Sequence, residues 1–370
     1  MKKNLFIKST LILILSGFLT KILGFIIKVI YTRIIGEYGI SLFTIATPTY
    51  SLLLTISTLA IPISISKLVS ENKGRSIRII TSAAFLILSI NFLLILLILL
   101  TRDFIAINLL KEPLASPILL AFALTLPFVS ISSVLKGYFA GKQNMVPHAT
   151  SNIIEQIIRL IIIITVLPIL MKKSVMHAVL GLILLTILSE ISSIIVFLFF
   201  LPKHINYKTK LLPSKKHTKD ILDISLPTVS SRIIGNIGYF LEPIILTNLL
   251  LFSGYTNSYI LREYGAYNAY SLALLTMPGF FIAAISTSLL PEISKFHGEK
   301  NNIMVKRRIH QALLFALIIG TFFSFIIFTF RDKLLFSLYN TTNGSNYIKI
   351  LAPFFVLFYL EVFLHLPFKL

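Results

Sequence analysis

Apolar stretches long enough to cross a membrane recur along almost the whole chain. Windows of about twenty or more mostly apolar residues occur at 9–34, 41–66, 79–101, 114–135, 152–171, 176–201, 221–250, 267–291, 310–330 and 347–370. None of them shows the strict alternation of apolar and polar residues that is typical of β-strands. The pattern therefore predicts an all-α integral membrane protein, a polytopic helical bundle with about ten transmembrane helices.

The distribution of charge predicts how these helices are oriented. Hydrophobic residues make up 56% of the 370 residues and charged residues only 13%, whereas roughly a quarter of a soluble domain is charged. Nineteen of the 34 lysines and arginines fall in segments on the same side as the N-terminus, and seven fall in the opposite segments. Because cytoplasmic loops carry the excess of basic residues, we expect a cytoplasmic N-terminus in the plasma membrane. The net charge of +20 then reflects topology and does not indicate nucleic acid as a partner.

The chain also matches itself in three places, which predicts two similar halves. The matching pairs are Thr20-Lys21-Ile22-Leu23-Gly24 with Ser231-Arg232-Ile233-Ile234-Gly235, Glu37-Tyr38-Gly39 with Glu263-Tyr264-Gly265, and Ile56-Ser57-Thr58 with Ile285-Ser286-Thr287. Six predicted helices separate the two copies, so both halves should have the same orientation and a pseudo-two-fold axis along the membrane normal. We expect an N-terminal six-helix lobe at 1–201, a basic cytoplasmic linker at 202–219, and a C-terminal lobe at 220–370.

Only four helices are predicted in the second lobe. We therefore expect that the sequence is a C-terminally truncated form of a protein with a complete second lobe. A natural protein with ten spans is the alternative.

Several charged side chains fall deep within the predicted spans. Lys21 and Lys28 are seven residues apart and so lie on one face of the first helix. Arg232 occupies the position in the second copy that Lys21 has in the first. A charge at the centre of a bilayer is costly and usually faces a cavity or a partner. We therefore interpret these cations as the lining of a polar cavity that binds an anion.

Acidic residues and helix breakers accompany these cations. Glu155 and Arg159 are four residues apart on one helix, so they either belong to the site or simply neutralise each other. Glu242 lies ten residues after Arg232, whereas Glu190 and Glu361 are expected to pair with neighbouring helices. Glycine and proline residues at matching places in the two copies are candidate hinges, although membrane helices also tolerate such residues without a functional role. They are Gly24, Pro48, Gly235 and Pro278.

No catalytic constellation is visible in the sequence. The seven histidines have no zinc-protease spacing, there is no cysteine, and neither a phosphate-binding glycine loop nor a nucleophile elbow occurs. The pattern predicts neither an enzyme nor a cofactor or metal.

Three segments resemble one family of membrane transporters. They are the first-helix motif Thr20-Lys21-Ile22-Leu23-Gly24, the stretch from Ser151 to Arg159, and the stretch from Met277 to Ser294. They are similar to the stage V sporulation protein B and polysaccharide-biosynthesis branch of the multidrug/oligosaccharidyl-lipid/polysaccharide exporter superfamily. The resemblance implies two six-helix lobes around a central cavity and transport of an isoprenoid-pyrophosphate-linked saccharide. Fourteen spans are expected in this family, so the second lobe of this chain departs from the pattern.

Together these observations predict a flippase for a lipid-linked oligosaccharide or a peptidoglycan precursor such as lipid II. Lys21, Lys28 and Arg232 would contact the pyrophosphate, with Arg159 secondary, while Glu155 and Glu242 would set the local charge or couple transport to Na⁺ or H⁺. The alternatives are a Na⁺- or H⁺-coupled multidrug exporter, an inactive truncated fragment or scaffold, and a membrane-embedded transferase. The scattered histidines argue against the transferase.

Overall fold

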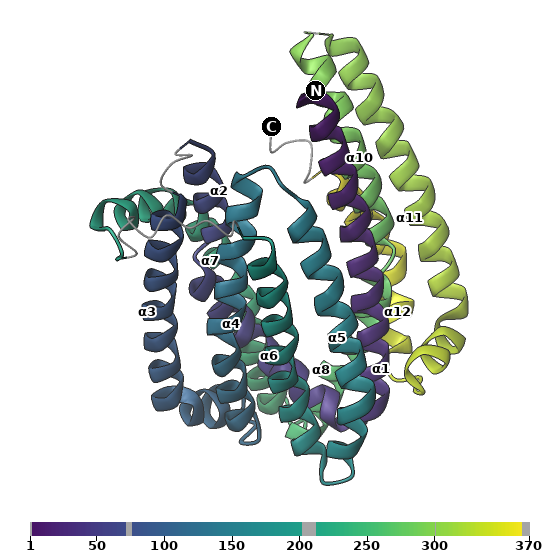
Figure 1. Ribbon diagram of the computed structural model, residues 1–370. Helices are drawn as coiled ribbons and strands as arrows, with labels where there is room; N and C mark the ends of the chain where they lie inside the picture. The colour runs from purple at the N-terminus through teal and green to yellow at the C-terminus, as the bar shows by residue number, and fades with distance from the viewer. Residues whose placement is uncertain (1, 72–75, 202–211, 300, 365–370) are drawn as a thin grey trace. The chain divides into compact units, whose positions relative to one another are not determined.

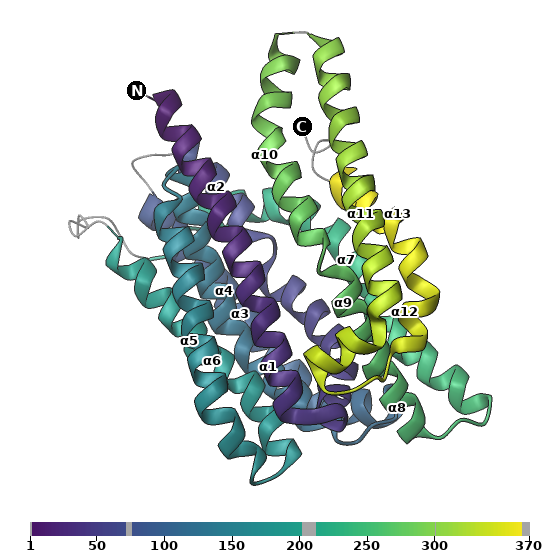
Figure 2. The same cartoon turned by 90° about the vertical axis from the view of Figure 1, so that its right-hand side faces the viewer.

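The described part of the chain consists of helices and short connections. The computed structural model describes residues 2–71, 76–201, 212–299 and 301–364, and no strand occurs among them. The helices form two compact units, one made of Met1–Leu13 and Ile34–Tyr264 and the other of Ile14–Arg33 and Gly265–Leu370. Figures 1 and 2 show the helices from two directions.

The first unit contains most of the long helices. Its elements after the first helix are α2 (Ile61–Glu71), α3 (Ser76–Asp103), the π-helix η1 (Phe104–Leu109), α4 (Ala115–Gly141), α5 (Val146–Met171), α6 (Val175–Phe199), α7 (Lys215–Phe252) and α8 (Asn257–Gly265). Local sequence explains several boundaries. Pro147 stands in the first turn of α5, where its missing N–H is not needed. The Ser174 side chain caps α6 by accepting a hydrogen bond of 3.1 Å from the backbone N–H of His177.

The helix α1 (Lys2–Thr58) joins the first two predicted spans. It is kinked at Gly36, whose φ of 68° and ψ of −178° are not helical. It ends at Leu59 and Ala60, which both have positive φ, before α2 begins. Since positive φ is costly for residues with a Cβ, packing around this break must hold it in place. Ser57 contributes by hydrogen bonding to Asn91 Oδ1 of α3 at 2.7 Å and to Ser130 Oγ of α4 at 2.6 Å.

Small residues allow α4 to pack closely on α2. A Cβ added to Gly137 would lie 2.8 Å from the Cα of Pro62, and one added to Gly141 would lie 2.7 Å from the carbonyl oxygen of Ser66. Helices in membranes associate mainly through such close van der Waals packing, because lipid tails are as apolar as leucine. The interior of the unit also contains stacked rings, with Tyr50 and Phe122 at 4.4 Å between centroids.

Two side-chain amides attach the α7–α8 region to the turn between η1 and α4. Asn248 Nδ2 donates to the carbonyl oxygen of Leu109 at 3.4 Å. Asn257 Nδ2 donates to the carbonyl oxygen of Lys111 at 2.7 Å and lies 3.4 Å from Glu112 Oε2. The turn between α7 and α8, which belongs to the second predicted half, is therefore fixed to the first half within this unit.

The second unit is built around α11. It contains the π-helix η2 (Ala266–Ser271), α9 (Leu272–Thr276), α10 (Gly279–Gly298), α11 (Asn302–Tyr339), α12 (Ser345–Leu351), the 3₁₀-helix η3 (Ala352–Phe354) and α13 (Phe355–Leu364). Figure 2 shows α10 and α11 side by side as a helical hairpin. Tyr359 is fully buried against Gly320, and its hydroxyl donates to the carbonyl oxygen of Leu275 at 2.6 Å.

Arg33 holds the end of α11 within the same unit. Its Nε donates to the carbonyl oxygen of Leu338 at 2.6 Å, and its Nη2 donates to the carbonyl oxygen of Ser337. These carbonyls have no partner inside the helix, so the guanidinium satisfies two exposed acceptors and complements the helix dipole.

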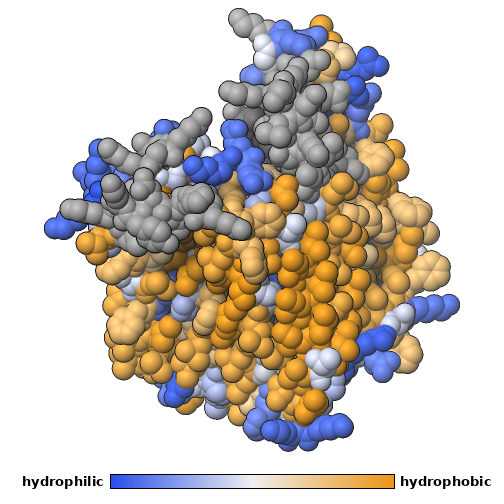
Figure 3. All heavy atoms as spheres, in the orientation of Figure 1, coloured by the Kyte–Doolittle hydropathy of each residue, from blue (hydrophilic) through white to orange (hydrophobic). Residues whose placement is uncertain are grey.

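The surface of the helices fits a membrane environment. Seven described helices are long and apolar enough to cross a membrane, namely Leu15–Glu71, Ser76–Leu109, Ala115–Gly141, Val146–Met171, Val175–Phe199, Lys215–Phe252 and Asn302–Tyr339. Large apolar side chains such as Phe92 and Leu100 on α3 and Ile161 on α5 are exposed. In Figure 3 hydrophobic residues cover the middle of the visible face, and hydrophilic residues gather towards its ends. The expected all-α membrane fold is confirmed.

Each of the ten predicted spans overlaps helical structure, but their number and orientation stay predictions. The compact units divide at Tyr264 and Gly265, whereas the predicted lobes divide at 202–219. The observed units are defined by compactness, whereas the predicted lobes are defined by the internal repeat, so one division does not test the other. The three-part division at 1–201, 202–219 and 220–370 therefore also stays a prediction.

Candidate functional site

A buried network of charges joins α4, α5 and α6. Glu155 Oε1 accepts a hydrogen bond of 2.8 Å from Arg159 Nη2, and its Oε2 lies 3.7 Å from Lys136 Nζ. Arg159 Nη2 is also 3.8 Å from Glu190 Oε1. The exposed fraction is 5% for Glu155 and 7% for Glu190. Two acids and two bases therefore balance within an environment where an isolated charge would be costly.

Polar groups around the network complete its hydrogen bonding. Arg159 Nε donates to Ser189 Oγ at 3.1 Å. Glu190 Oε2 and Gln156 Oε1 are buried and have no hydrogen-bond partner among the described residues. Two buried acceptors thus remain available to a water molecule, a proton or a cation.

The network shows how the acidic residues pair, while their role in the transport site stays a prediction. The pairing of Glu155 with Arg159 is confirmed, and so is the pairing of Glu190 with a neighbouring helix. Lys136 belongs to α4, because the helix continues for six residues past the predicted span end at 135 and ends at Gly141. The assignment of this segment to the cytoplasmic side stays a prediction.

The two lysines of the first helix lie in the second compact unit. Lys21 is exposed, and its Nζ lies 5.5 Å from the centroid of the Phe280 ring, a cation–π distance. Lys28 is half-buried and makes no hydrogen bond or ion pair with any residue that the structure describes. The segment 14–33 contains Lys21, Lys28 and Arg33 but no acidic residue.

Arg232 and Glu242 lie on α7 in the first compact unit. Arg232 is exposed, and its carbonyl oxygen accepts a hydrogen bond of 3.0 Å from Asn236 Nδ2. Asn236 also donates to Thr55 Oγ1 at 3.0 Å. The expected meeting of Arg232 with Lys21 across a symmetry axis stays a prediction.

The candidate hinges differ in their local structure. Gly24, Pro48 and Gly235 lie within helices α1 and α7. Pro278 stands at a break, in the turn between α9 and α10. The structure adds two irregular positions that the repeat did not indicate, the kink at Gly36 and the break at Leu59 and Ala60.

One structural role was missed in the sequence. Arg33 caps α11 from more than 300 positions away. No local pattern could have shown this contact. Among the described residues there is also no group of three or more His, Cys, Asp or Glu that could hold a metal ion.

Comparison with known proteins places the chain in a family. A model described as "Polysaccharide biosynthesis protein" matches residues 6–297, and the MatE model matches residues 243–369. The chain belongs to the polysaccharide biosynthesis protein family. It is 34% identical to stage V sporulation protein B of Bacillus subtilis over 373 aligned residues, which cover 98% of this chain and 72% of that protein.

Two further similarities support the same superfamily. The chain is 27% identical to the lipid II flippase MurJ of Bacillus subtilis over 188 aligned residues, covering 45% of this chain and 33% of MurJ. The solved inward-facing structure of a multidrug resistance MATE transporter has a TM-score of 0.68 at 14% identity, covering 94% of this chain and 78% of that one. The protein is therefore a multi-pass membrane transporter of the plasma membrane and not an enzyme.

Proposed function

We propose that this protein moves an isoprenoid-pyrophosphate-linked oligosaccharide, or a peptidoglycan precursor such as lipid II, across the plasma membrane. The observation that carries the proposal is the acid-free segment 14–33, in which Lys28 is half-buried and has no protein counter-charge among the described residues. A lysine in that state favours an anionic ligand, because the ligand supplies the missing negative charge. The printed names of the relatives support a role in cell-wall, spore-cortex or polysaccharide synthesis.

The chemistry of the substrate explains why cations are needed. A pyrophosphate loses strong hydration when it leaves water, and lysine or arginine donors can replace that hydration with charge-assisted hydrogen bonds. In the proposal Lys21 and Lys28 supply such donors from the first helix, and Arg232 supplies them from α7. The lipid chain stays in the bilayer, and transport follows alternating access between the two lobes.

Arg159 and the acids have a different place in this proposal. The guanidinium of Arg159 is already engaged by Glu155 and Glu190, so its role towards substrate is secondary. Glu155 sets the charge of the α4–α6 network, and Glu242 sets the local charge around its position on α7. The open oxygens of Glu190 and Gln156 make the network the candidate place for coupling to Na⁺ or H⁺.

A multidrug exporter is the second candidate, because the MatE model matches residues 243–369. A site for organic cations needs more buried acids than bases. The first helix offers only bases between residues 14 and 33, and the α4–α6 network is balanced. The charge distribution favours the lipid-linked saccharide.

The test is transport of a fluorescent polyprenyl-pyrophosphate disaccharide in proteoliposomes. Lys21→Gln, Lys28→Gln and Arg232→Gln are each compared with Lys173→Gln, which neutralises an exposed lysine after α5. Losing one charge-assisted contact is expected to slow flipping about tenfold. Unchanged rates in all three variants and in the Lys21→Gln/Arg232→Gln double variant would refute the assigned roles.

A further inference from the structure

The helix α11 carries a basic cluster, made of Lys306, Arg307 and His310, close to its start. The Asn301 side chain caps this helix by accepting a hydrogen bond of 3.2 Å from the backbone N–H of Met304. All three side chains of the basic cluster are exposed, and none makes a hydrogen bond or ion pair with any residue that the structure describes. Their donors are therefore open to a partner outside the protein.

The sequence of α11 supplies no counter-charge for the basic cluster. Residues 300–331 contain no acid, and Glu299, the nearest acid before them, takes part in another interaction. The opposite end of the helix differs, because Arg331 Nε lies 3.9 Å from Asp332 Oδ2 and donates to Ser345 Oγ at 3.1 Å. Arg331 is thus satisfied within the protein, whereas the basic cluster is not.

The basic cluster shares one face of α11 with apolar side chains. Positions three and four apart lie on the same face of a helix. The exposed residues with this spacing are Ile303, Arg307, His310, Leu314 and Ile318. The buried face is different, since Ala312 and Ala316 pack in a core with Tyr359. One exposed face therefore offers cations first and an apolar stripe directly after them.

The length of the apolar run places the basic cluster at the height of lipid headgroups. Residues 312–330 contain no charge, and nineteen helical residues span about 28 Å, close to the hydrocarbon thickness of about 30 Å. Arg307 precedes this run by about 7 Å along the helix axis, and a long basic side chain at such a place reaches the headgroup layer. In the orientation predicted from the sequence, this is the cytoplasmic leaflet.

We propose that this face of α11 binds one anionic phospholipid, such as phosphatidylglycerol. Lys306 and Arg307 hold the phosphate through charge-assisted hydrogen bonds, His310 donates a further one, and an acyl chain lies along Leu314 and Ile318. A zwitterionic headgroup is less suitable, because the basic cluster would repel its ammonium. The face shares no residue with the proposed substrate site, so the two proposals are independent.

The neighbouring Arg308 separates a site on one face from a diffuse attraction. The excess of basic residues on one membrane side requires charge there, but on no particular face of a helix. Arg308 has the same charge as Arg307, yet it is half-buried and donates from Nη1 to Gln311 Oε1 at 3.1 Å. A bound lipid should depend on Arg307 and not on Arg308, whereas a diffuse field would depend equally on both.

The test uses the purified full chain in an uncharged detergent. Phosphatidylglycerol, phosphatidylethanolamine and phosphatidylcholine with the same acyl chains are titrated separately, and native mass spectrometry measures the bound lipid. Soluble glycerol phosphate shows whether a phosphate alone is sufficient. The variants are Lys306→Gln, Arg307→Gln and their double variant. Arg308→Gln and Lys333→Gln are the matched controls, since Lys333 is an exposed cation near the other end of α11. Size-exclusion chromatography checks that each variant is folded.

The wild type should bind phosphatidylglycerol more tightly than either zwitterionic lipid. A basic residue near the membrane surface contributes about fivefold to anionic lipid binding. Lys306→Gln and Arg307→Gln should each weaken binding by about this factor and the double variant by about 25-fold, while both controls leave it unchanged. Equal binding of the three lipids, unchanged affinity in the double variant, equal weakening by folded Arg308→Gln, or binding of glycerol phosphate as tight as that of the lipid would overturn the proposal.

Discussion

Replacing Glu155 by Gln should destabilise the first compact unit. The carboxylate of Glu155 touches Arg159 at 2.8 Å and Lys136 at 3.7 Å, and only 5% of the residue is exposed. Glutamine keeps the shape of the side chain but removes its charge. The α4–α6 network would then hold two bases and one acid.

The magnitude follows from the burial of the two bases. Removing one partner of a buried ion pair typically costs about 3–5 kcal/mol. The side chains of Arg159 and Lys136 are 22% and 25% exposed, so water compensates part of the loss. Arg159 also keeps Glu190 at 3.8 Å. We therefore expect a loss of about 2–3 kcal/mol in the free energy of unfolding.

The assay must suit a chain without tryptophan or cysteine, so neither tryptophan fluorescence nor a thiol-reactive dye can report unfolding. Far-UV circular dichroism in mixed micelles measures the wild type, Glu155→Gln, Arg159→Met and the double variant. Because the two residues interact, Arg159→Met should cost less in the Glu155→Gln background than alone. A Glu155→Gln variant within about 0.5 kcal/mol of the wild type, the range of ordinary surface substitutions, would refute the reasoning.

Three other predictions concern single contacts. Arg33→Ala removes the cap of α11 and should cost about 1–2 kcal/mol in unfolding experiments, whereas equal stability would show that the cap is unimportant. Gly137→Ala brings a Cβ to 2.8 Å from backbone of α2 and should lower stability by about 1–3 kcal/mol; a more stable variant would contradict the close packing. Burial raises the pKa of Glu112, which lies outside the spans, so the folded protein binds this proton more tightly than the unfolded chain. Its contribution to stability should fall as pH rises from about the usual carboxyl pKa through the raised value, and Glu112→Gln should flatten the melting temperature against pH; parallel curves would refute this.

The fold class was predictable because backbone N–H and C=O groups inside a membrane must hydrogen bond within their own helix. Each membrane-spanning helix therefore appears in the sequence as a long apolar run. The ranges 79–101 and 152–171, for example, fall on α3 and α5. The separation of the first two spans was also visible in the sequence. The backbone of Gly36 is not helical, so it interrupts α1 between the predicted spans 9–34 and 41–66.

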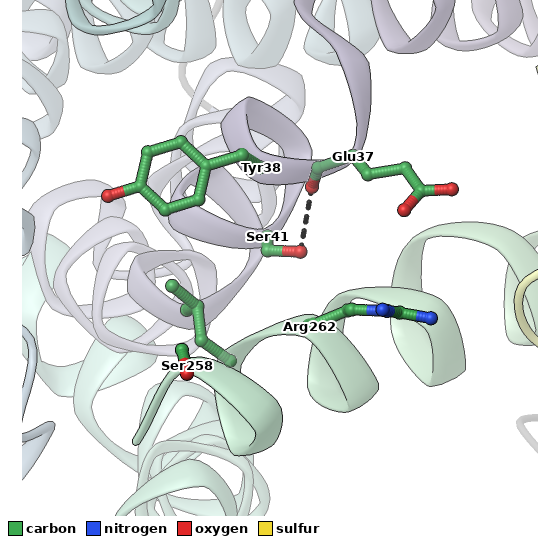
Figure 4. A pocket seen from close by; sticks show the side chains of 6 residues that line it. Glu37, Tyr38, Ser41, Ser258 and Arg262 are labelled. Atoms are coloured by element: carbon green, nitrogen blue, oxygen red, sulfur yellow. Dashed lines mark hydrogen bonds between the residues drawn. The ribbon is translucent and has the colours of Figure 1, made fainter. Parts of the chain in front are cut away.

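The candidate site was predictable only where residues are neighbours along a helix. The pair Glu155 and Arg159 follows from spacing of four residues. The contribution of Lys136 depends on how far α4 extends, and that of Glu190 on how α5 and α6 are rotated. Such tertiary contacts leave no local pattern. For the same reason the sequence does not indicate the small pocket between α1 and α8 in Figure 4, which Tyr38 and Leu261 help to line.

The most direct test of the central claim compares two lipids in proteoliposomes that contain the wild-type chain. One carries a disaccharide on a polyprenyl pyrophosphate, and the other carries the same disaccharide on the same chain through a neutral linker. The account predicts protein-dependent flipping of the pyrophosphate lipid and little movement of the neutral one. Equal rates for both lipids would contradict recognition of the pyrophosphate by the cations of α1 and α7.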